Sequence, residues 1–275
     1  MKIGFIGYGS MGSMIIEGLL DSSVLKRDDV IISNRTLNKL DKIKKEYPEI
    51  EITNDNEYLA SECQKIFIFV GTFAVKEILE DIKKHINPNT HIIHISAALT
   101  LENIEKVFEG KITKIIPSLT STVKEGVSLI HHNKNVDEKE AEFINKVFES
   151  IGDVKIVQEE DFEVGSDLTS CAPAFIASIF QKFAETGSTQ GNFTYEESEK
   201  MVIKTLYGTV KLLYEENMSF DDIISRVATK GGITEQGVKI LEKELPETFD
   251  DLFKTTLKRH EEIKEELRQQ YKTND

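Results

Sequence analysis

Three glycines close to the start of the chain constrain its fold more than any other feature. The apolar, β-prone residues Lys2–Ile6 run directly into the pattern G-x-G-x-x-G at Gly7, Gly9 and Gly12. Behind the glycines, apolar residues recur at three- and four-residue steps, which is typical of a helix packed on one face. Strand, glycine turn and helix in this order form the context in which the pattern binds a dinucleotide. The alternative is a glycine turn with a structural role alone.

Each glycine has its own purpose in a dinucleotide-binding turn. Gly7 permits the tight turn, Gly9 lets the backbone approach a pyrophosphate, and Gly12 lets the helix pack closely on the strand. The free N–H groups at the start of the helix then face the phosphates. The predicted cofactor contacts in this turn are Gly7, Tyr8, Gly9, Ser10, Met11 and Gly12.

The first part of the chain, up to residue 158, alternates short β-rich runs with amphipathic stretches. This alternation predicts an α/β fold, with a Rossmann-type, parallel, doubly wound sheet covered by helices on both faces. The predicted strands are Lys2–Ile6, Val30–Ser33, Glu51–Thr53, Lys65–Val70, His91–Ser96, Lys111–Ile116, Val127–Ile130 and Val154–Gln158. Helical patterns such as Leu37–Glu46 and Val75–Ile86 lie between them.

The second part, residues 159–275, has helical patterns only. The predicted helices are Phe162–Thr186, Thr194–Glu216, Phe220–Ala228, Thr234–Glu244 and Glu247–Tyr271. An all-α domain of about 115 residues has a modest core, so we expect it to bury its remaining apolar face against a second copy of the chain. The prediction is an all-α dimerisation domain that forms a homodimer or a larger homo-oligomer.

Composition argues against several partners. The net charge of −14 leaves no basic surplus for binding nucleic acid. No stretch approaches the roughly 18 apolar residues of a membrane-spanning helix, so no membrane partner is expected. The two cysteines, Cys63 and Cys171, have neither disulfide nor metal-ligand spacing, and no metal is predicted. These features together predict a cytoplasmic protein.

The end of the second predicted strand bears on the choice of dinucleotide. An acidic residue there binds the ribose hydroxyls of NAD, whereas an arginine pairs with the 2′-phosphate of NADP. Asn34, Arg35 and Thr36 follow this strand, without an acid. We therefore predict NADP(H), with these three residues as cofactor contacts. Asn34 and Thr36 can also form a turn and cap the next helix while Arg35 lies in solvent, and both descriptions can hold.

A second glycine pair, Gly231-Gly232, lies between two predicted helices. Thr229 and Lys230 precede it, and the next helix begins near Thr234. The N–H groups and the dipole at such a helix start suit a carboxylate. The alternative is an ordinary helix-to-helix turn with a threonine cap.

Four segments together make nearly the whole chain resemble the pyrroline-5-carboxylate reductase family. They are the opening glycine pattern, Pro117-Ser118-Leu119-Thr120 with Gly126, Ser170-Cys171-Ala172-Pro173-Ala174-Phe175, and Thr229-Lys230-Gly231-Gly232-Ile233-Thr234. The resemblance implies a Rossmann domain followed by a helical dimerisation domain. It also implies reduction of a cyclic imine, 1-pyrroline-5-carboxylate, to L-proline by NADPH.

The resemblance assigns roles to individual residues. Thr234 matches the family threonine that hydrogen-bonds the ring nitrogen of the substrate, and it is the predicted catalytic residue. The implied substrate contacts are Pro173, Thr229, Lys230, Gly231, Gly232 and Ile233. Further implied cofactor contacts follow the fourth and fifth strands, at Val70, Gly71, Thr72, Ser96 and Ala97.

Departures from the family pattern leave another function open. The lysine and proline after the fourth strand are Gly71-Thr72 here, and the asparagine of the proline segment is Ser118. Lys230 replaces a proline, and Ile233 replaces a threonine. This combination is closer to the divergent ComER-type late-competence branch, whose members are described as reductase-like. Such a protein would use the scaffold for another ligand or for regulation.

The implied chemistry depends on orientation of the imine carbon beside the nicotinamide more than on a strong general base. We interpret the strand histidines as packing or surface residues; they are His91, His94, His131 and His132. A β-hydroxyacid dehydrogenase is a further alternative, because its opening segment is similar. Those enzymes need a lysine acid/base in a glycine-rich segment, whereas the corresponding segment here contains Pro173 and no glycine.

Overall fold

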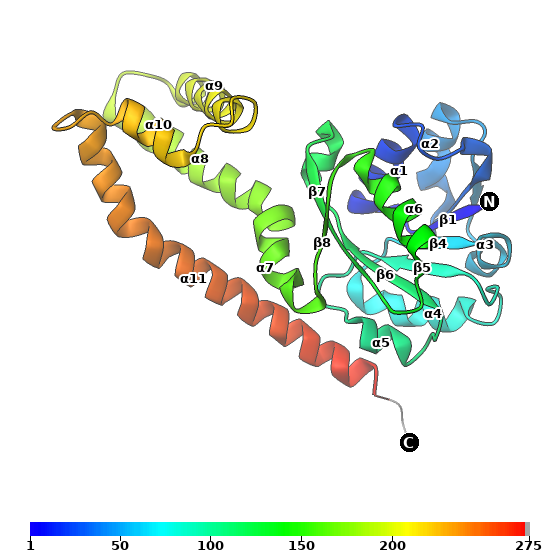
Figure 1. Cartoon of the computed structure of the whole chain (residues 1–275). Helices are drawn as coiled ribbons and strands as arrows, with labels where there is room; N and C mark the ends of the chain where they lie inside the picture. Colours follow the sequence, from blue (N-terminus) through cyan, green and yellow to red (C-terminus); the bar gives the residue numbers. More distant parts are fainter. Residues whose placement is uncertain (273–275) are drawn as a thin grey trace. The chain divides into compact units, whose positions relative to one another are not determined.

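The computed structural model describes residues 1–272 (Figure 1). The chain divides into two compact units. Unit 1 consists of Met1–Cys171 together with Thr256–Asp275, and unit 2 is Ala172–Thr255. The boundary predicted after residue 158, between a cofactor-binding domain and a helical domain, stays a prediction.

One sheet of eight strands forms the centre of unit 1, in the order β3-β2-β1-β4-β5-β6-β7-β8. The strands are β1 Ile3–Ile6, β2 Val30–Ser33, β3 Glu51–Thr53, β4 Lys65–Ile68, β5 His91–His94, β6 Lys111–Ile116, β7 Gly126–His132 and β8 Gly152–Ile156. The predicted α/β fold with a doubly wound sheet is confirmed, but β6 and β7 pair antiparallel. Only residues 117–125 join these two strands, which is fewer than the dozen or so that a parallel crossover needs.

Helices cover both faces of this sheet (Figure 1). They are α1 Ser10–Asp21, α2 Asp41–Glu46, α3 Asn56–Glu62, α4 Val75–Ile82, α5 Leu101–Glu105, α6 Glu138–Glu149 and α7 Phe162–Ser166. Neighbouring residues of a strand face opposite layers: Phe67 packs in the core that includes α1, α2 and α6, and Ile66 packs in the core that includes α3, α4 and α5. Burial on both faces explains why the central strands have apolar runs without alternation.

Unit 2 is helical. It contains α8 Ala172–Gln190, α9 Tyr195–Tyr214, α10 Phe220–Val227 and the first part of α11 Ile233–Gln270. Helices α9 and α10 each begin with a capping box, formed by Thr194 with Glu197 and by Ser219 with Asp222. These reciprocal hydrogen bonds satisfy backbone groups that a helix start otherwise leaves unpaired.

The structure corrects the prediction of two helices after the second glycine pair. The predicted helices Thr234–Glu244 and Glu247–Tyr271 are one continuous helix, α11, with Pro246 inside it. A proline removes one N–H donor and crowds the carbonyl four residues earlier, which weakens or bends a helix. The break predicted at this position was wrong because the remaining hydrogen bonds continue the helix on both sides.

The histidines of β5 lie in the core of unit 1. His91 and His94 are both fully buried, whereas His131 and His132 are partly buried. Nδ1 of His94 accepts a hydrogen bond from the backbone N–H of Ser96 at 3.3 Å. Burial, with a smaller contribution from the charge of Lys114, lowers the pKa of His94 to about 3. His94 is therefore neutral in the folded protein at ordinary pH.

We expect stability to fall as the pH drops from about 6.5 to about 3, because unfolded His94 binds a proton that the folded ring does not. Replacing His94 by asparagine keeps an acceptor near Nδ1 and removes the titration. The slope of the free energy of unfolding against pH should then decrease by about 1 kcal/mol per pH unit below the ordinary histidine pKa. Urea unfolding at several pH values measures this slope, and an unchanged slope would contradict a buried neutral His94.

Candidate functional site

The turn between β1 and α1 has the close backbone contacts expected of the three glycines. Gly7 has a φ of +102°, and a Cβ on it would lie 2.5 Å from the carbonyl oxygen of Phe69. A Cβ on Gly12 would lie 2.8 Å from the carbonyl oxygen of Gly7. Among residues 1–272, and apart from its chain neighbours, no heavy atom lies within 4 Å of a Cβ built on Gly9. Gly9 therefore faces open space, where a ligand can approach the backbone.

A cavity of about 680 Å³ lies beside this turn. It extends along the carboxyl ends of β1, β2 and β4, where the strand order changes direction. Doubly wound sheets bind ligands at this switch point. The predicted cofactor residues that line the cavity are Gly7, Tyr8, Gly9, Asn34, Arg35, Val70 and Gly71.

The other predicted cofactor residues do not line this cavity. Ser10, Met11 and Gly12 form the first turn of α1, and Thr36 follows Arg35. Thr72, Ser96 and Ala97 follow β4 and β5, where Ser96 Oγ donates a hydrogen bond to Thr72 Oγ1 at 2.8 Å. That contact connects the ends of two neighbouring strands.

Asn34 and Arg35 have different surroundings after β2. Asn34 Oδ1 accepts a hydrogen bond from the N–H of Tyr8 at 3.2 Å, and its Nδ2 donates to the carbonyl of Thr36 at 2.8 Å. Asn34 therefore connects the loop after β2 to the turn after β1. Arg35 is exposed, and its guanidinium has no hydrogen bond or ion pair with residues 1–272. An unpaired guanidinium beside the cavity suits a bidentate contact with a phosphate.

Polar residues that were not predicted from the sequence also line this cavity, among them Asn54, Asn56, Glu77 and Asp81. Ser33 Oγ donates to Asn56 Oδ1 at 2.6 Å, so Asn56 is fixed against the end of β2. The sequence contains a signal that places Asn54 and Asn56 at the cavity, because they follow the third parallel strand and the ends of such strands meet at one edge of the sheet. It contains no such signal for Glu77 and Asp81, because their position depends on how α4 packs.

The second glycine pair lies in unit 2, directly before α11. Gly231 has a φ of +77°, which favours glycine. Its N–H donates a hydrogen bond to Glu235 Oε2 at 2.8 Å. The N–H of Gly232 donates to the carbonyl of Thr229 at 2.8 Å. Both predicted carboxylate donors are therefore engaged within the chain in this structure.

Other polar groups remain available at the start of α11. Among the described residues, no acceptor receives the backbone N–H groups of Ile233 and Thr234. Lys230 is exposed and has no ion-pair or hydrogen-bond partner in this part of the chain, and Ile233 is 94% exposed. Free N–H groups and a nearby cation make this helix start suitable for an anion. The remaining predicted substrate residue, Pro173, is the second residue of α8.

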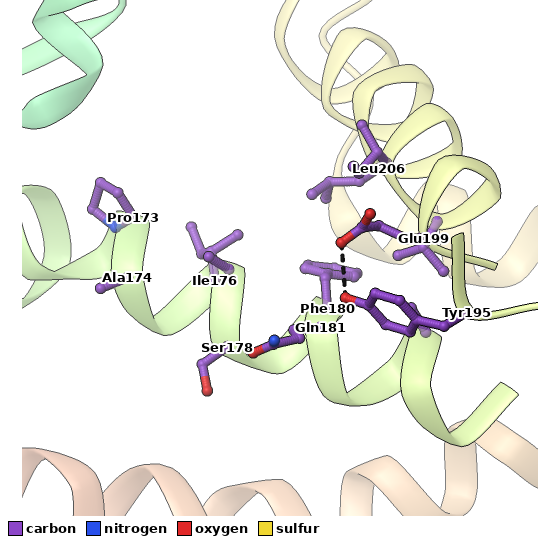
Figure 2. A pocket seen from close by; sticks show the side chains of 13 residues that line it. Pro173, Ala174, Ile176, Ser178, Phe180, Gln181, Tyr195, Glu199 and Leu206 are labelled. Carbon is purple, nitrogen blue, oxygen red and sulfur yellow. Dashed lines mark hydrogen bonds between the residues drawn. The ribbon is translucent and has the colours of Figure 1, made fainter. Parts of the chain in front are cut away.

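An apolar groove of about 670 Å³ lies between α8 and α9 (Figure 2). The residues that line it include Pro173, Ile176, Phe180, Tyr195, Ile203 and Leu206. Tyr195 Oη donates a hydrogen bond to Glu199 Oε1 at 2.7 Å at one side of the groove (Figure 2). Ile203 is 60% exposed and the nearby Tyr207 is 57% exposed. A contiguous apolar surface of this kind marks an interaction site.

None of the helices within residues 1–272 combines the length and apolar character needed to cross a membrane. This same part of the chain contains no group of three or more His, Cys, Asp or Glu side chains that could hold a metal ion. The absence of a metal and the cytoplasmic location stay predictions.

Two protein families match successive parts of the chain. Residues 159–263 match the family described as "Pyrroline-5-carboxylate reductase dimerisation". Residues 2–98 match the family described as "NADP oxidoreductase coenzyme F420-dependent". The first match covers most of the helical part, and the second covers β1 to β5 with the glycine turn.

Relatives with similar sequences extend over nearly the full length. "Pyrroline-5-carboxylate reductase 3" of Bacillus subtilis is 36% identical over 270 residues, which are 98% of this chain and 99% of the relative. "ComE operon protein 4" of the same organism is 30% identical over 271 residues, again 98% and 99%.

Solved structures have the same fold. A pyrroline-5-carboxylate reductase from Coxiella burnetii has a TM-score of 0.84 at 26% identity, covering 97% of this chain and 98% of the other. A pyrroline carboxylate reductase from Plasmodium falciparum, solved with NADP bound, has a TM-score of 0.81 at 23% identity, with the same coverage.

Proposed function

Because the chain belongs to the pyrroline-5-carboxylate reductase family and is an NADP-dependent oxidoreductase, we propose that it reduces 1-pyrroline-5-carboxylate to L-proline. The observation that carries the proposal is the similarity to a reductase of that name over both parts of the chain, at 36% identity. The predicted family, fold class and cofactor are confirmed. The substrate, the product and the roles of individual residues remain our proposal.

The residues beside the glycine turn fit NADPH. Gly9 leaves the backbone of the turn open, and Arg35 offers an unpaired guanidinium for the 2′-phosphate. We assign the pyrophosphate to the turn between Gly7 and the start of α1, as in other dinucleotide-binding folds. When bound, NADPH supplies the hydride that reduces the C=N bond.

The start of α11 fits the anionic, nitrogen-containing ring. The free N–H groups of Ile233 and Thr234 and the ammonium of Lys230 are available for the carboxylate. Thr234 is exposed, and we assign its hydroxyl to the ring nitrogen, where it donates a hydrogen bond as hydride addition to the imine carbon shifts the π electrons onto that nitrogen. Water at this exposed helix start supplies the proton that the nitrogen gains. Orientation of the ring by these contacts supplies most of the expected rate enhancement.

The proposed reaction is tested by following NADPH oxidation with synthetic pyrroline-5-carboxylate at micromolar enzyme. We expect steady turnover with L-proline as the product. An inert wild-type enzyme would contradict the proposal. If the Lys230→Pro variant then gains activity, the fold serves another ligand in the wild type.

A second candidate function is favoured by the similarity to ComE operon protein 4 at 30% identity. Lys230 and Ile233, which differ from the reductase pattern, are both exposed at the proposed substrate position. A cation there favours a larger or more acidic ligand than pyrroline-5-carboxylate. In this case the protein binds NADPH but serves a reductase-like role with another ligand.

The helical part assembles with further copies of the chain, as expected of a dimerisation family. We propose that the dimer contact covers the groove between α8 and α9. Ile203→Asp places a charge in this groove, and we expect it to shift the protein from a dimer toward the 31.2 kDa monomer. Light scattering at low micromolar concentration measures the change. Thr205→Asp, on the same helix but outside the groove lining, is the control; dissociation by both variants, or by neither, would contradict the assignment.

A further inference from the structure

The loop before α11 is closed by a carboxylate of the helix that follows it. Glu235, the third residue of α11, accepts the N–H of Gly231 on Oε2 at 2.8 Å. This hydrogen bond, with a smaller contribution from Lys239, lowers the pKa of the Glu235 carboxyl below its usual value. The loop before the helix thus binds an anion that belongs to the chain itself.

The same carboxylate has a second partner on the helix. Glu235 Oε1 lies 3.5 Å from Nζ of Lys239, one helical turn further on. Gln236 Nε2 also donates to Oε2, at 3.5 Å. The ammonium of Lys239 continues to bind the Glu235 carboxylate when this carboxylate releases the N–H of Gly231. The side chain of Glu235 can therefore reach both the N–H of Gly231 and the ammonium of Lys239.

A substrate carboxylate at this loop meets the negative charge of Glu235. Two carboxylates at one backbone N–H repel each other, so one of them must leave. The substrate has contacts that Glu235 does not make, because the N–H groups of Ile233 and Thr234 are still free. A ligand that uses these donors together with the N–H of Gly231 can displace Glu235. A simple carboxylate that contacts only the N–H of Gly231 gains less binding free energy.

We propose that Glu235 is a specificity-determining residue that competes with the substrate carboxylate for the N–H of Gly231 and moves fully onto Lys239 when substrate binds. The inference rests on the proposed function, since it takes this loop as the carboxylate seat. It requires that removal of the Glu235 charge strengthens substrate binding. If Glu235 only capped the helix, removal of its charge would instead weaken substrate binding.

Steady-state kinetics of Glu235→Gln tests the competition. We expect KM for pyrroline-5-carboxylate to fall about three- to tenfold, with kcat and KM for NADPH unchanged, because a neutral amide competes less well for the N–H. Lys239→Met should raise KM, because Glu235 then lacks the ion pair that draws it away from the N–H of Gly231. Glu242→Gln is the matched control; this exposed glutamate of the same helix has no ion pair with a described residue. An unchanged or raised KM in an active Glu235→Gln enzyme overturns the inference.

A measurement that does not need turnover separates this inference from the proposed function. In protein labelled with 15N-glycine, the amide signal of Gly231 should follow the titration of Glu235, and saturating L-proline should abolish this response. If the wild type lacks turnover but L-proline abolishes the response, the competition stands while the proposed function fails. A response that persists at saturating L-proline, or that is absent from the free protein, overturns the inference. Thermal unfolding of Glu235→Gln accompanies both tests, because a loss of helix capping lowers Tm and raises KM together.

Discussion

Replacing Thr234 by alanine is expected to lower kcat for pyrroline-5-carboxylate about 30- to 150-fold, which corresponds to a rise of about 2–3 kcal/mol in the barrier. Thr234 is exposed at the start of α11, where its own N–H and that of Ile233 have no acceptor among the described residues. At the ring nitrogen, the hydroxyl donates a hydrogen bond that strengthens as hydride addition shifts electrons onto that nitrogen. Its loss therefore affects the transition state more than ground-state binding. The measurement is steady-state turnover, with the affinity for NADPH determined in parallel.

Two companion variants separate the hydrogen bond from the shape of the side chain. Thr234→Ser retains the hydroxyl and should keep most of the activity, whereas Thr234→Val retains the shape and should behave like the alanine variant. Equal activity of Thr234→Ala and wild type would show that the assigned position is wrong. A fall in Tm that accompanies the loss of activity would instead indicate a role in the structure of the loop.

Replacing Arg35 by aspartate is expected to weaken NADPH binding by about 1–3 kcal/mol, roughly five- to 150-fold in Kd, with little change for NADH. Arg35 lines the cavity beside the glycine turn and has no ion pair with the described residues. The exchange removes a charge-assisted contact with the 2′-phosphate and adds repulsion. Fluorescence titration with both cofactors measures the difference.

The discrimination between the two cofactors is the decisive part of the Arg35 experiment. Arg35→Lys keeps the charge without the bidentate geometry and should give an intermediate Kd for NADPH. A wild-type protein that prefers NADH would contradict the assignment of Arg35. Equal weakening of NADPH and NADH by Arg35→Asp would point to a general change in the loop, which Asn34 connects to Tyr8.

The parts of the fold that follow from local physics could be predicted from the sequence. Strand β4 is buried on both faces, so it has an apolar run, and Gly7 has a backbone conformation that few other residues adopt. The cavity follows from these elements, because parallel strands place their carboxyl ends at one edge. Val70 and Gly71, which the family resemblance implied as cofactor contacts, line this cavity because they follow β4.

Other features depend on contacts that a linear pattern does not contain. The continuity of α11 through Pro246 is set by the balance of hydrogen bonds on both sides of the proline. Asn34 was predicted as a cofactor contact, but whether its amide also connects two loops depends on the approach of Tyr8. The contact between Glu235 and Gly231 arises from the particular turn before the helix. Such side-chain contacts require the folded backbone.

The fate of a deuterium at C4 of NADPH tests the proposed reaction most directly. The enzyme is incubated with pyrroline-5-carboxylate and stereospecifically deuterated NADPH of each kind, and the product is analysed by mass spectrometry and NMR. With one of the two cofactors, we expect L-proline that carries a single deuterium on the ring carbon formerly doubly bonded to nitrogen. L-proline without deuterium from either cofactor, or oxidation of NADPH without L-proline, would contradict the proposed reaction.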